Sequence, residues 1–70
     1  MTVSNKIKHL LIERDMTIKE LAERLNTSGN NVSNKLRRDN FSEKEIKKIA
    51  EALNCDYNIS FIMRDTGEKI

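Results

Sequence analysis

The sequence contains no proline and no tryptophan, and it has only two glycines and one cysteine. Proline and glycine are the residues that most disfavour a helix, so their scarcity predicts a mainly helical chain. A single cysteine excludes an internal disulfide, and no further Cys or His stands at metal-ligand spacing beside it. We therefore expect no metal ion and no other cofactor.

Long apolar runs are also missing. The first ten residues, MTVSNKIKHL, resemble neither a signal peptide nor a membrane-spanning segment. This absence predicts a cytoplasmic protein with no membrane partner. The chain is nevertheless 37% hydrophobic, which is too apolar for a disordered protein. Its 70 residues suffice for one domain with a small core, which needs close helix packing or a partner subunit.

Acidic residues are absent from one stretch of the chain. The net charge is only +2, but residues 1–40 carry eight basic and five acidic side chains, whereas residues 41–70 carry five and six. No acid lies between Arg24 and Arg38. The positive charge is therefore a local feature of the middle of the chain and not a basic tail.

Helical spacing begins near the N-terminus. A first helix from Val3 to about Asp15, capped by Thr2 or Ser4, is predicted by the apolar residues Val3, Ile7, Leu10 and Leu11. The capping-box sequence from Thr17 to Glu20 then opens a second helix of about two turns. Its apolar face consists of Leu21, Ala22 and Leu25, and it ends at a break formed by Asn26 and Thr27.

Two more helices follow. Ser28 is expected to cap the third, which runs to about Leu36 with Gly29, Val32 and Leu36 facing inward. A polar loop, Arg38 to Asn40, leads to a second capping box that starts at Ser42, with Phe41 as its hydrophobic staple. The fourth helix ends at Asn54, and its inner stripe consists of Ile46, Ile49, Ala50 and Leu53.

After the fourth helix the hydrophobic period changes to two. Polar residues alternate with Tyr57, Ile59, Phe61 and Met63, a pattern that predicts a strand. Asp65, Thr66 and Gly67 form a turn or a fraying end, and only three residues follow. We expect a helical domain at residues 1–54 and a C-terminal strand at residues 55–70.

The short second helix, the tight break and the polar third helix resemble the helix-turn-helix of the Cro and lambda-repressor-like family. The resemblance is carried by TIKELAERL, residues 17–25, and VSNKL, residues 32–36, and residues 41–53 resemble the helix that follows. It covers about residues 3–54. It implies a mostly α, four-helix lambda-repressor-like helix-turn-helix domain, here with a C-terminal β-strand. By this resemblance, residues 1–54 are expected to be the DNA-binding domain and residues 55–70 the dimerisation segment.

The sequence departs from the family pattern twice. Asn26 stands where the family usually has a glycine in the turn. The alternating strand replaces the fifth helix that the family often has, which resembles the Cro-type variation in which a C-terminal strand pairs with its twin in a dimer.

Short amide and hydroxyl side chains crowd the third helix, although Asn and Ser are mediocre helix formers. In a helix-turn-helix, the start of the motif's second helix enters the major groove, and here this is the third helix of the chain. In the groove, Asn pairs bidentately with adenine, and Ser can donate or accept a hydrogen bond. The resemblance implies base contacts from Asn30 and Asn34, and next from Asn31 and Ser33. The alternative interpretation is that these are ordinary solvated positions.

Phosphate contacts are expected at helix starts and on basic flanks. Thr17 and Ser28 lie at predicted helix N-termini, where free N–H groups attract anions. Lys35, Arg37 and Arg38 can neutralise phosphates around the end of the third helix, and Lys19 can do so beside the second. Such contacts position a protein on DNA and carry little sequence information. Each of these charges can alternatively be a simple solubilising charge.

No catalytic or metal site is predicted. His9 has no second ligand at suitable spacing and is interpreted as a surface or partly buried residue. Cys55 is interpreted as a packed or idle thiol. Because the chain offers no nucleophile–base pair and no Gly-rich phosphate loop, it is not predicted to be an enzyme.

The predicted strand points to a second copy of the chain. A lone strand has unpaired edges, and pairing across a two-fold axis would satisfy them and bury apolar residues among Tyr57, Ile59, Phe61 and Met63. A dimer would place two recognition helices about one helical turn (~34 Å) apart on one face of DNA. A weak hairpin through Asp65, Thr66 and Gly67 is the competing prediction.

These features predict a sequence-specific double-stranded DNA-binding regulator. A small dimeric transcriptional repressor is the simplest form, because the chain has no room for a small-molecule sensor. The alternative is a protein-interaction module, an antitoxin or assembly partner, that keeps the helix-turn-helix fold. The acid-free segment Ser28–Arg38 favours DNA binding.

Overall fold

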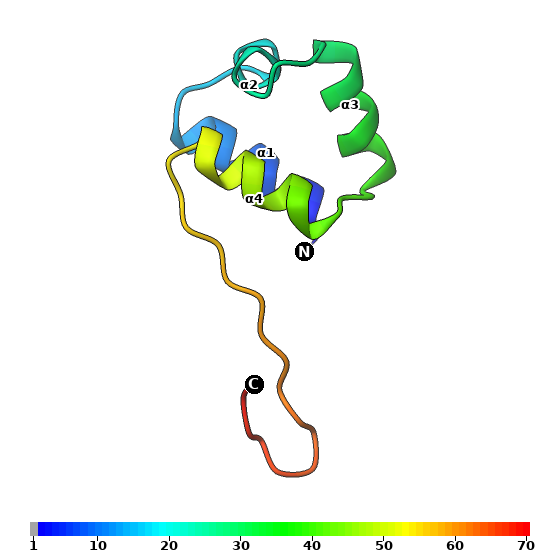
Figure 1. Ribbon diagram of the computed structural model, residues 1–70, viewed down its shortest axis with the longest axis vertical. Helices are drawn as coiled ribbons and strands as arrows, with labels where there is room; N and C mark the ends of the chain where they lie inside the picture. The colour runs from blue at the N-terminus through cyan, green and yellow to red at the C-terminus, as the bar shows by residue number, and fades with distance from the viewer. Residues whose placement is uncertain (1) are drawn as a thin grey trace.

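The computed structural model describes residues 2–70 as four helices followed by an extended C-terminal arm (Figure 1). The helices are α1 (Val3–Glu13), α2 (Ile18–Arg24), α3 (Gly29–Arg38) and α4 (Glu43–Ala52). The predicted four-helix architecture is confirmed. Two helix ends differ from the prediction. Helix α1 ends at Glu13, before the predicted end near Asp15. Helix α3 continues two residues beyond the predicted end at Leu36, so that Arg38 lies in its last turn and not in a loop.

Each helix begins at a hydroxyl side chain that accepts a hydrogen bond from a backbone N–H three residues later. These N-caps are Thr2, Thr17, Ser28 and Ser42. Both predicted capping boxes are present, with Glu20 and Glu45 bonding back to the cap residues. Of the two candidates for α1, Thr2 is the cap, which leaves Ser4 available for a different contact.

Each helix is followed within two residues by Asn or Asp in the left-handed backbone region, with φ of 51–58° at Asp15, Asn26, Asp39 and Asn54. Among residues with a side chain, Asn and Asp tolerate this conformation best. The chain can therefore end four helices without glycine. The same property lets Asn26 occupy the turn between α2 and α3.

The core lies between the four helices. Its buried cluster contains the predicted core residues Leu21, Ala22, Val32 and Leu36 together with Ile7, Leu11, Ile49 and Leu53. Two arginines tie the helices together at the end of α4. Arg14 donates to the Asn54 carbonyl at 3.1 Å, and Arg24 donates to the Ala52 carbonyl at 3.0 Å. Arg24, at one border of the acid-free stretch, therefore has a structural contact.

The predicted strand at Tyr57–Met63 is wrong. The β-structure in residues 2–70 is a single antiparallel bridge between Ile62 and Lys69. The chain turns back before Gly67, whose φ is +74°, and Phe61 and Ile70 exchange backbone hydrogen bonds of 3.2 and 2.8 Å. Residues 68–70 pair with Phe61 and Met63, and the first half of the alternating segment has no backbone partner within residues 2–70. The competing prediction, a weak hairpin, describes this segment better.

The arm, residues 55–70, leads away from the helices and lengthens the molecule to 43 Å (Figure 1). Residues 56–70 are all exposed. The Tyr57 hydroxyl donates to Glu43 Oε1 of α4 at 3.4 Å, and the pKa of Tyr57 is raised by loss of hydration and by the nearby Glu43 carboxylate. None of the helices in residues 2–70 has the length and apolarity that a membrane crossing requires.

Candidate nucleic-acid interface

The outward face of α3 carries polar side chains on a helix whose opposite face is buried. Val32 and Leu36 are 6% and 4% exposed, whereas Asn30, Asn34 and Arg37 are exposed. The last three are spaced i, i+4 and i+7, which places them on one face of an α-helix. The structure thus brings together two predicted base contacts and one predicted phosphate contact.

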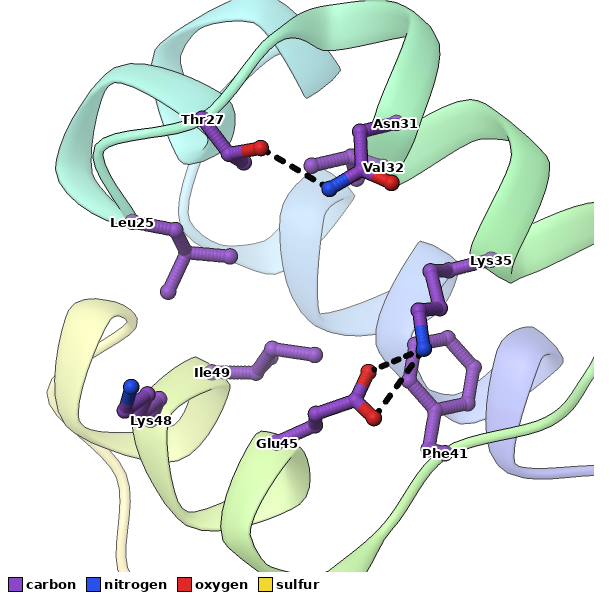
Figure 2. Close-up of a pocket in the computed structure, with 9 residues that line it drawn as sticks. All are labelled: Leu25, Thr27, Asn31, Val32, Lys35, Phe41, Glu45, Lys48 and Ile49. Carbon is purple, nitrogen blue, oxygen red and sulfur yellow. Dashed lines mark hydrogen bonds and ion pairs between the residues drawn. The ribbon is translucent and has the colours of Figure 1, made fainter.

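Asn31 lies at an edge of this face and is engaged within the chain. Its amide nitrogen donates to Thr27 Oγ1 at 2.8 Å, and Figure 2 shows the side chain turned toward the turn between α2 and α3. The Asn31 backbone N–H donates to the Ser28 hydroxyl. Asn31 therefore stabilises the start of α3, and a base contact would have to be made alongside these bonds.

Lys35 is likewise engaged. Its Nζ lies 3.0 and 2.9 Å from the two carboxylate oxygens of Glu45, on α4 (Figure 2). The Lys35 hydrogen bond lowers the pKa of the Glu45 carboxyl below its ordinary value, and hydrogen bonds from Ser42 add to this shift. Lys35 can approach a phosphate only by sharing or giving up this ion pair.

A hollow of about 300 Å³ separates α3 from α4 and the end of α2 (Figure 2). Leu25, Val32, Phe41 and Ile49 form its apolar part, and Asn31 and Lys35 lie on its rim with Thr27, Glu45 and Lys48. The two engaged side chains of α3 therefore face its neighbours, whereas Asn30 and Asn34 face solvent.

The start of α3 is better suited to a phosphate than the start of α2. At α2, the Glu20 carboxylate already accepts from the backbone N–H and the hydroxyl of Thr17, each at 3.2 Å. The first turn of α3 contains no acid, and its N-cap is Ser28. An unneutralised helix N-terminus attracts anions. Of the predicted contacts at helix starts, Ser28 therefore has the more favourable surroundings.

The remaining predicted contacts are exposed. Lys19 lies in the first turn of α2, and Arg37 and Arg38 lie in the last turn of α3. Ser33 is exposed on the flank of α3 opposite to Asn31. These side chains leave the polar face of α3 bordered by cations at its C-terminal end.

Sequence reasoning missed contacts that join distant parts of the chain. Ser4 and Asp39 link the start of α1 to the end of α3, and Glu45 holds Lys35. Spacing rules report neighbours within one helix, so they contain no signal for a bond between residues 35 positions apart. The Thr27–Asn31 bond could have been predicted from the sequence, because the two residues are only four positions apart on either side of the Ser28 cap.

The residues left without a predicted function occupy peripheral positions. His9 pairs with Glu13 at 3.2 Å on the exposed side of α1. Cys55 is half-buried, and its thiol donates to the Leu53 carbonyl at 3.3 Å. Within residues 2–70 no group of three or more His, Cys, Asp and Glu is placed to hold a metal ion.

Comparison with known families supplies the family assignment. Residues 6–60, most of the chain, match the family described as the Cro/C1-type HTH DNA-binding domain. Comparisons with curated proteins and with solved structures gave no match. The matched residues include all of α2, α3 and α4 and the polar face described above. The chain belongs to the Cro/C1-type helix-turn-helix DNA-binding family.

Proposed function

We propose that this protein is a small repressor that binds a specific double-stranded DNA site as a dimer, with α3 in the major groove. One observation carries the proposal. Among residues 2–70, the side-chain hydrogen bonds of α3 involve Asn31 and Lys35, and none involves Asn30, Asn34 or Arg37. The exposed face therefore keeps its full hydrogen-bonding capacity for a ligand.

Asn30 and Asn34 are the proposed base-reading residues. Both are exposed, and they stand one turn apart on the same face of α3. An Asn amide matches the N6 donor and N7 acceptor of adenine in the major groove. Ser33 and Asn31 flank this pair and are proposed as secondary contacts, and the Thr27–Asn31 bond limits what Asn31 can present.

Phosphate contacts are proposed on both sides of the reading face. Ser28 and the free N–H groups at the start of α3 serve one side, and Arg37 and Arg38 serve the other. Lys19 and Thr17 are proposed to approach the DNA backbone from α2. Lys35 is also proposed as a phosphate contact, because its side chain is 40% exposed although it pairs with Glu45. This arrangement fits the observation that phosphate contacts fix the orientation of a protein on DNA.

Dimerisation through the arm is the second part of the proposal. Tyr57, Ile59, Phe61 and Met63 are exposed in the monomer, with 72% of Phe61 accessible. The backbone of residues 57–60 also has no regular partner within the described chain. A second copy of the chain would bury these apolar side chains and pair with this backbone. We therefore keep the division into a DNA-reading part, residues 1–54, and a dimerisation segment, residues 55–70.

The proposal includes no catalytic activity and no small-molecule effector, and it places the protein in the cytoplasm together with its DNA. The alternative, a protein-interaction module such as an antitoxin, is supported by the same apolar arm. An exposed strand-like segment can add to the sheet edge of a different protein. Under that alternative the polar face of α3 has no role.

The test is selection from a pool of random duplexes at near-physiological salt, with the wild-type protein and the Asn30→Ala/Asn34→Ala double variant. The wild-type protein should enrich a symmetric site. The double variant should still bind DNA but should not enrich this site, because each lost bidentate contact removes about 1–3 kcal/mol of discrimination between the right and the wrong base. Asn40→Ala, outside α3, is the matched control. Absence of enrichment by the wild-type protein, or unchanged enrichment by the double variant, would contradict the proposal.

A further inference from the structure

Two hydrogen bonds tie the end of α3 to the start of α1. The backbone N–H of Ser4 donates to Asp39 Oδ1 at 2.8 Å, and the Ser4 hydroxyl donates to the Leu36 carbonyl at 2.7 Å. Ser4 is 4% exposed and is the one buried polar residue of the described chain. We call this pair of contacts the Ser4–Asp39 link.

The link satisfies backbone groups that neither helix can satisfy itself. The Ser4 N–H is among the first four of α1, and the Leu36 carbonyl is among the last four of α3. Each would otherwise have to find water, and Ser4 is buried. The two helix ends are therefore bonded directly to one another, between residues 32 and 35 positions apart in the sequence.

The charge of Asp39 is unexpected at this position. Its backbone is left-handed, with φ 51° and ψ 45°, a conformation that Asn and Gly adopt without adding a charge. Its negative charge directly follows Arg37 and Arg38, where it opposes a DNA phosphate. The carboxylate oxygen accepts from the Ser4 N–H, which gives the side chain a role that glycine could not fill.

We propose that Ser4 and Asp39 are positioning residues that set the angle at which α3 is presented to DNA, an inference that rests on the proposed function above. The ten residues of α3 span about 15 Å. A tilt of about 10° would move one end by roughly 2–3 Å, the length of a hydrogen bond. The link holds the C-terminal end of α3, while the Ser28 cap and the Thr27–Asn31 bond hold its start.

Asp39→Asn and Asp39→Gly form a matched pair for the test. Both remove the same charge and both suit a left-handed backbone, but only Asn keeps an oxygen that can accept from Ser4. The readout is the ratio of affinities for the selected site and for random duplex. A partly unfolded variant loses both affinities equally, so this ratio is insensitive to stability alone.

Asp39→Asn should keep the wild-type ratio within about twofold. Asp39→Gly should lower the ratio roughly tenfold, because without the bond to Ser4 the C-terminal end of α3 is no longer held in line with the base edges. Ser4→Ala, which removes the bond to Leu36, should lower the ratio in the same direction. Equal ratios for Asp39→Asn and Asp39→Gly would overturn the proposal. If Ser4→Ala does not fold, the Asp39 pair decides alone.

Residual dipolar couplings of the free protein give a second readout that needs no DNA. They should report a changed angle between α1 and α3 in Asp39→Gly and the wild-type angle in Asp39→Asn. An unchanged angle in Asp39→Gly would overturn the link as a positioning device. If the wild-type protein selects no DNA site, the proposed function fails, and these couplings still decide whether the link sets the helix angle.

Discussion

At the scale of single residues, the side chains of α3 fall into two groups according to their bonds within the chain. Asn31 and Lys35 are engaged by Thr27 and Glu45, whereas Asn30 and Asn34 face solvent. The helical period of the sequence separated the buried from the exposed positions. It could not separate the engaged from the free ones, because Lys35 meets Glu45 only after α3 and α4 have packed.

The arginines at the end of α3 are expected to act through charge alone. Arg37→Ala and Arg38→Ala should each weaken binding to all DNA sequences by a similar factor. Each should also reduce the slope of log K against log salt concentration by about 1, the effect of one lost phosphate contact. Titrations of a labelled duplex at several salt concentrations measure this slope.

Lys69→Ala is the control for the arginine variants, because Lys69 lies at the far end of the arm. A change in base preference without a change in salt slope would contradict the assignment of Arg37 and Arg38 to phosphates.

The Lys35–Glu45 ion pair gives a pH-dependent contribution to stability. The pKa of Glu45 in the folded protein lies below its ordinary value of 4.5, mainly because of the Lys35 hydrogen bond. The ion pair therefore stabilises the fold above about pH 4.5, and this contribution is lost as the pH falls through the folded-state pKa. Glu45→Gln should lower the thermal midpoint at pH 7, and its difference from wild type should shrink below pH 4.5.

Glutamine retains the capping box of α4, so the substitution isolates the ion pair. Glu20→Gln is the control, since Glu20 has the same capping role and is not in either ion pair described for residues 2–70. A difference between Glu45→Gln and wild type that is equal at pH 7 and at pH 3 would contradict this account.

At the scale of elements, local sequence signals located all four helices, because each helix has an N-cap residue before it and an Asn or Asp with a left-handed backbone after it. The caps Thr17, Ser28 and Ser42 and the left-handed residues Asn26 and Asn54 are local devices that need no partner. The predicted strand failed for the opposite reason. A strand needs a second strand, and alternation at residues 57–63 does not say whether one exists in the same chain.

The turn between α2 and α3 provides a test of these local devices. Asn26 has φ of 58°, where an alanine is strained and a glycine is not. Asn26→Gly should leave the free energy of unfolding equal to or above that of wild type. Asn26→Ala should lie about 1 kcal/mol below the glycine variant. Urea denaturation of the two variants measures the difference.

Asn40→Ala is the matched control for the turn variants, because Asn40 is exposed and is not among the residues with positive φ. Equal stabilities of Asn26→Ala and Asn26→Gly would show that the left-handed turn carries no strain.

At the scale of the whole molecule, the four helices form a compact domain, and the arm extends from it as an exposed segment with apolar side chains (Figure 1). The core of this helical domain does not include Ile59 or Phe61. Charges placed on these residues should therefore leave the helices folded and act on self-association only.

The double variant Ile59→Lys/Phe61→Lys should raise the dissociation constant of the proposed dimer by at least about tenfold, because it places like charges where apolar surface would be buried. Sedimentation equilibrium under reducing conditions, which keep Cys55 from cross-linking, measures this constant. Ser60→Lys adds a charge to the same segment without removing an apolar side chain and should have a smaller effect. Self-association of the double variant equal to that of wild type would contradict dimerisation through the arm.

The central claim is that the outward face of α3 meets DNA, and an amide chemical-shift titration with duplex DNA tests it most directly. The largest shifts should fall on residues 28–38, with smaller ones at the start of α2 and few in the arm. Shifts confined to the arm, or no shifts at any DNA concentration, would contradict the claim and favour a protein partner.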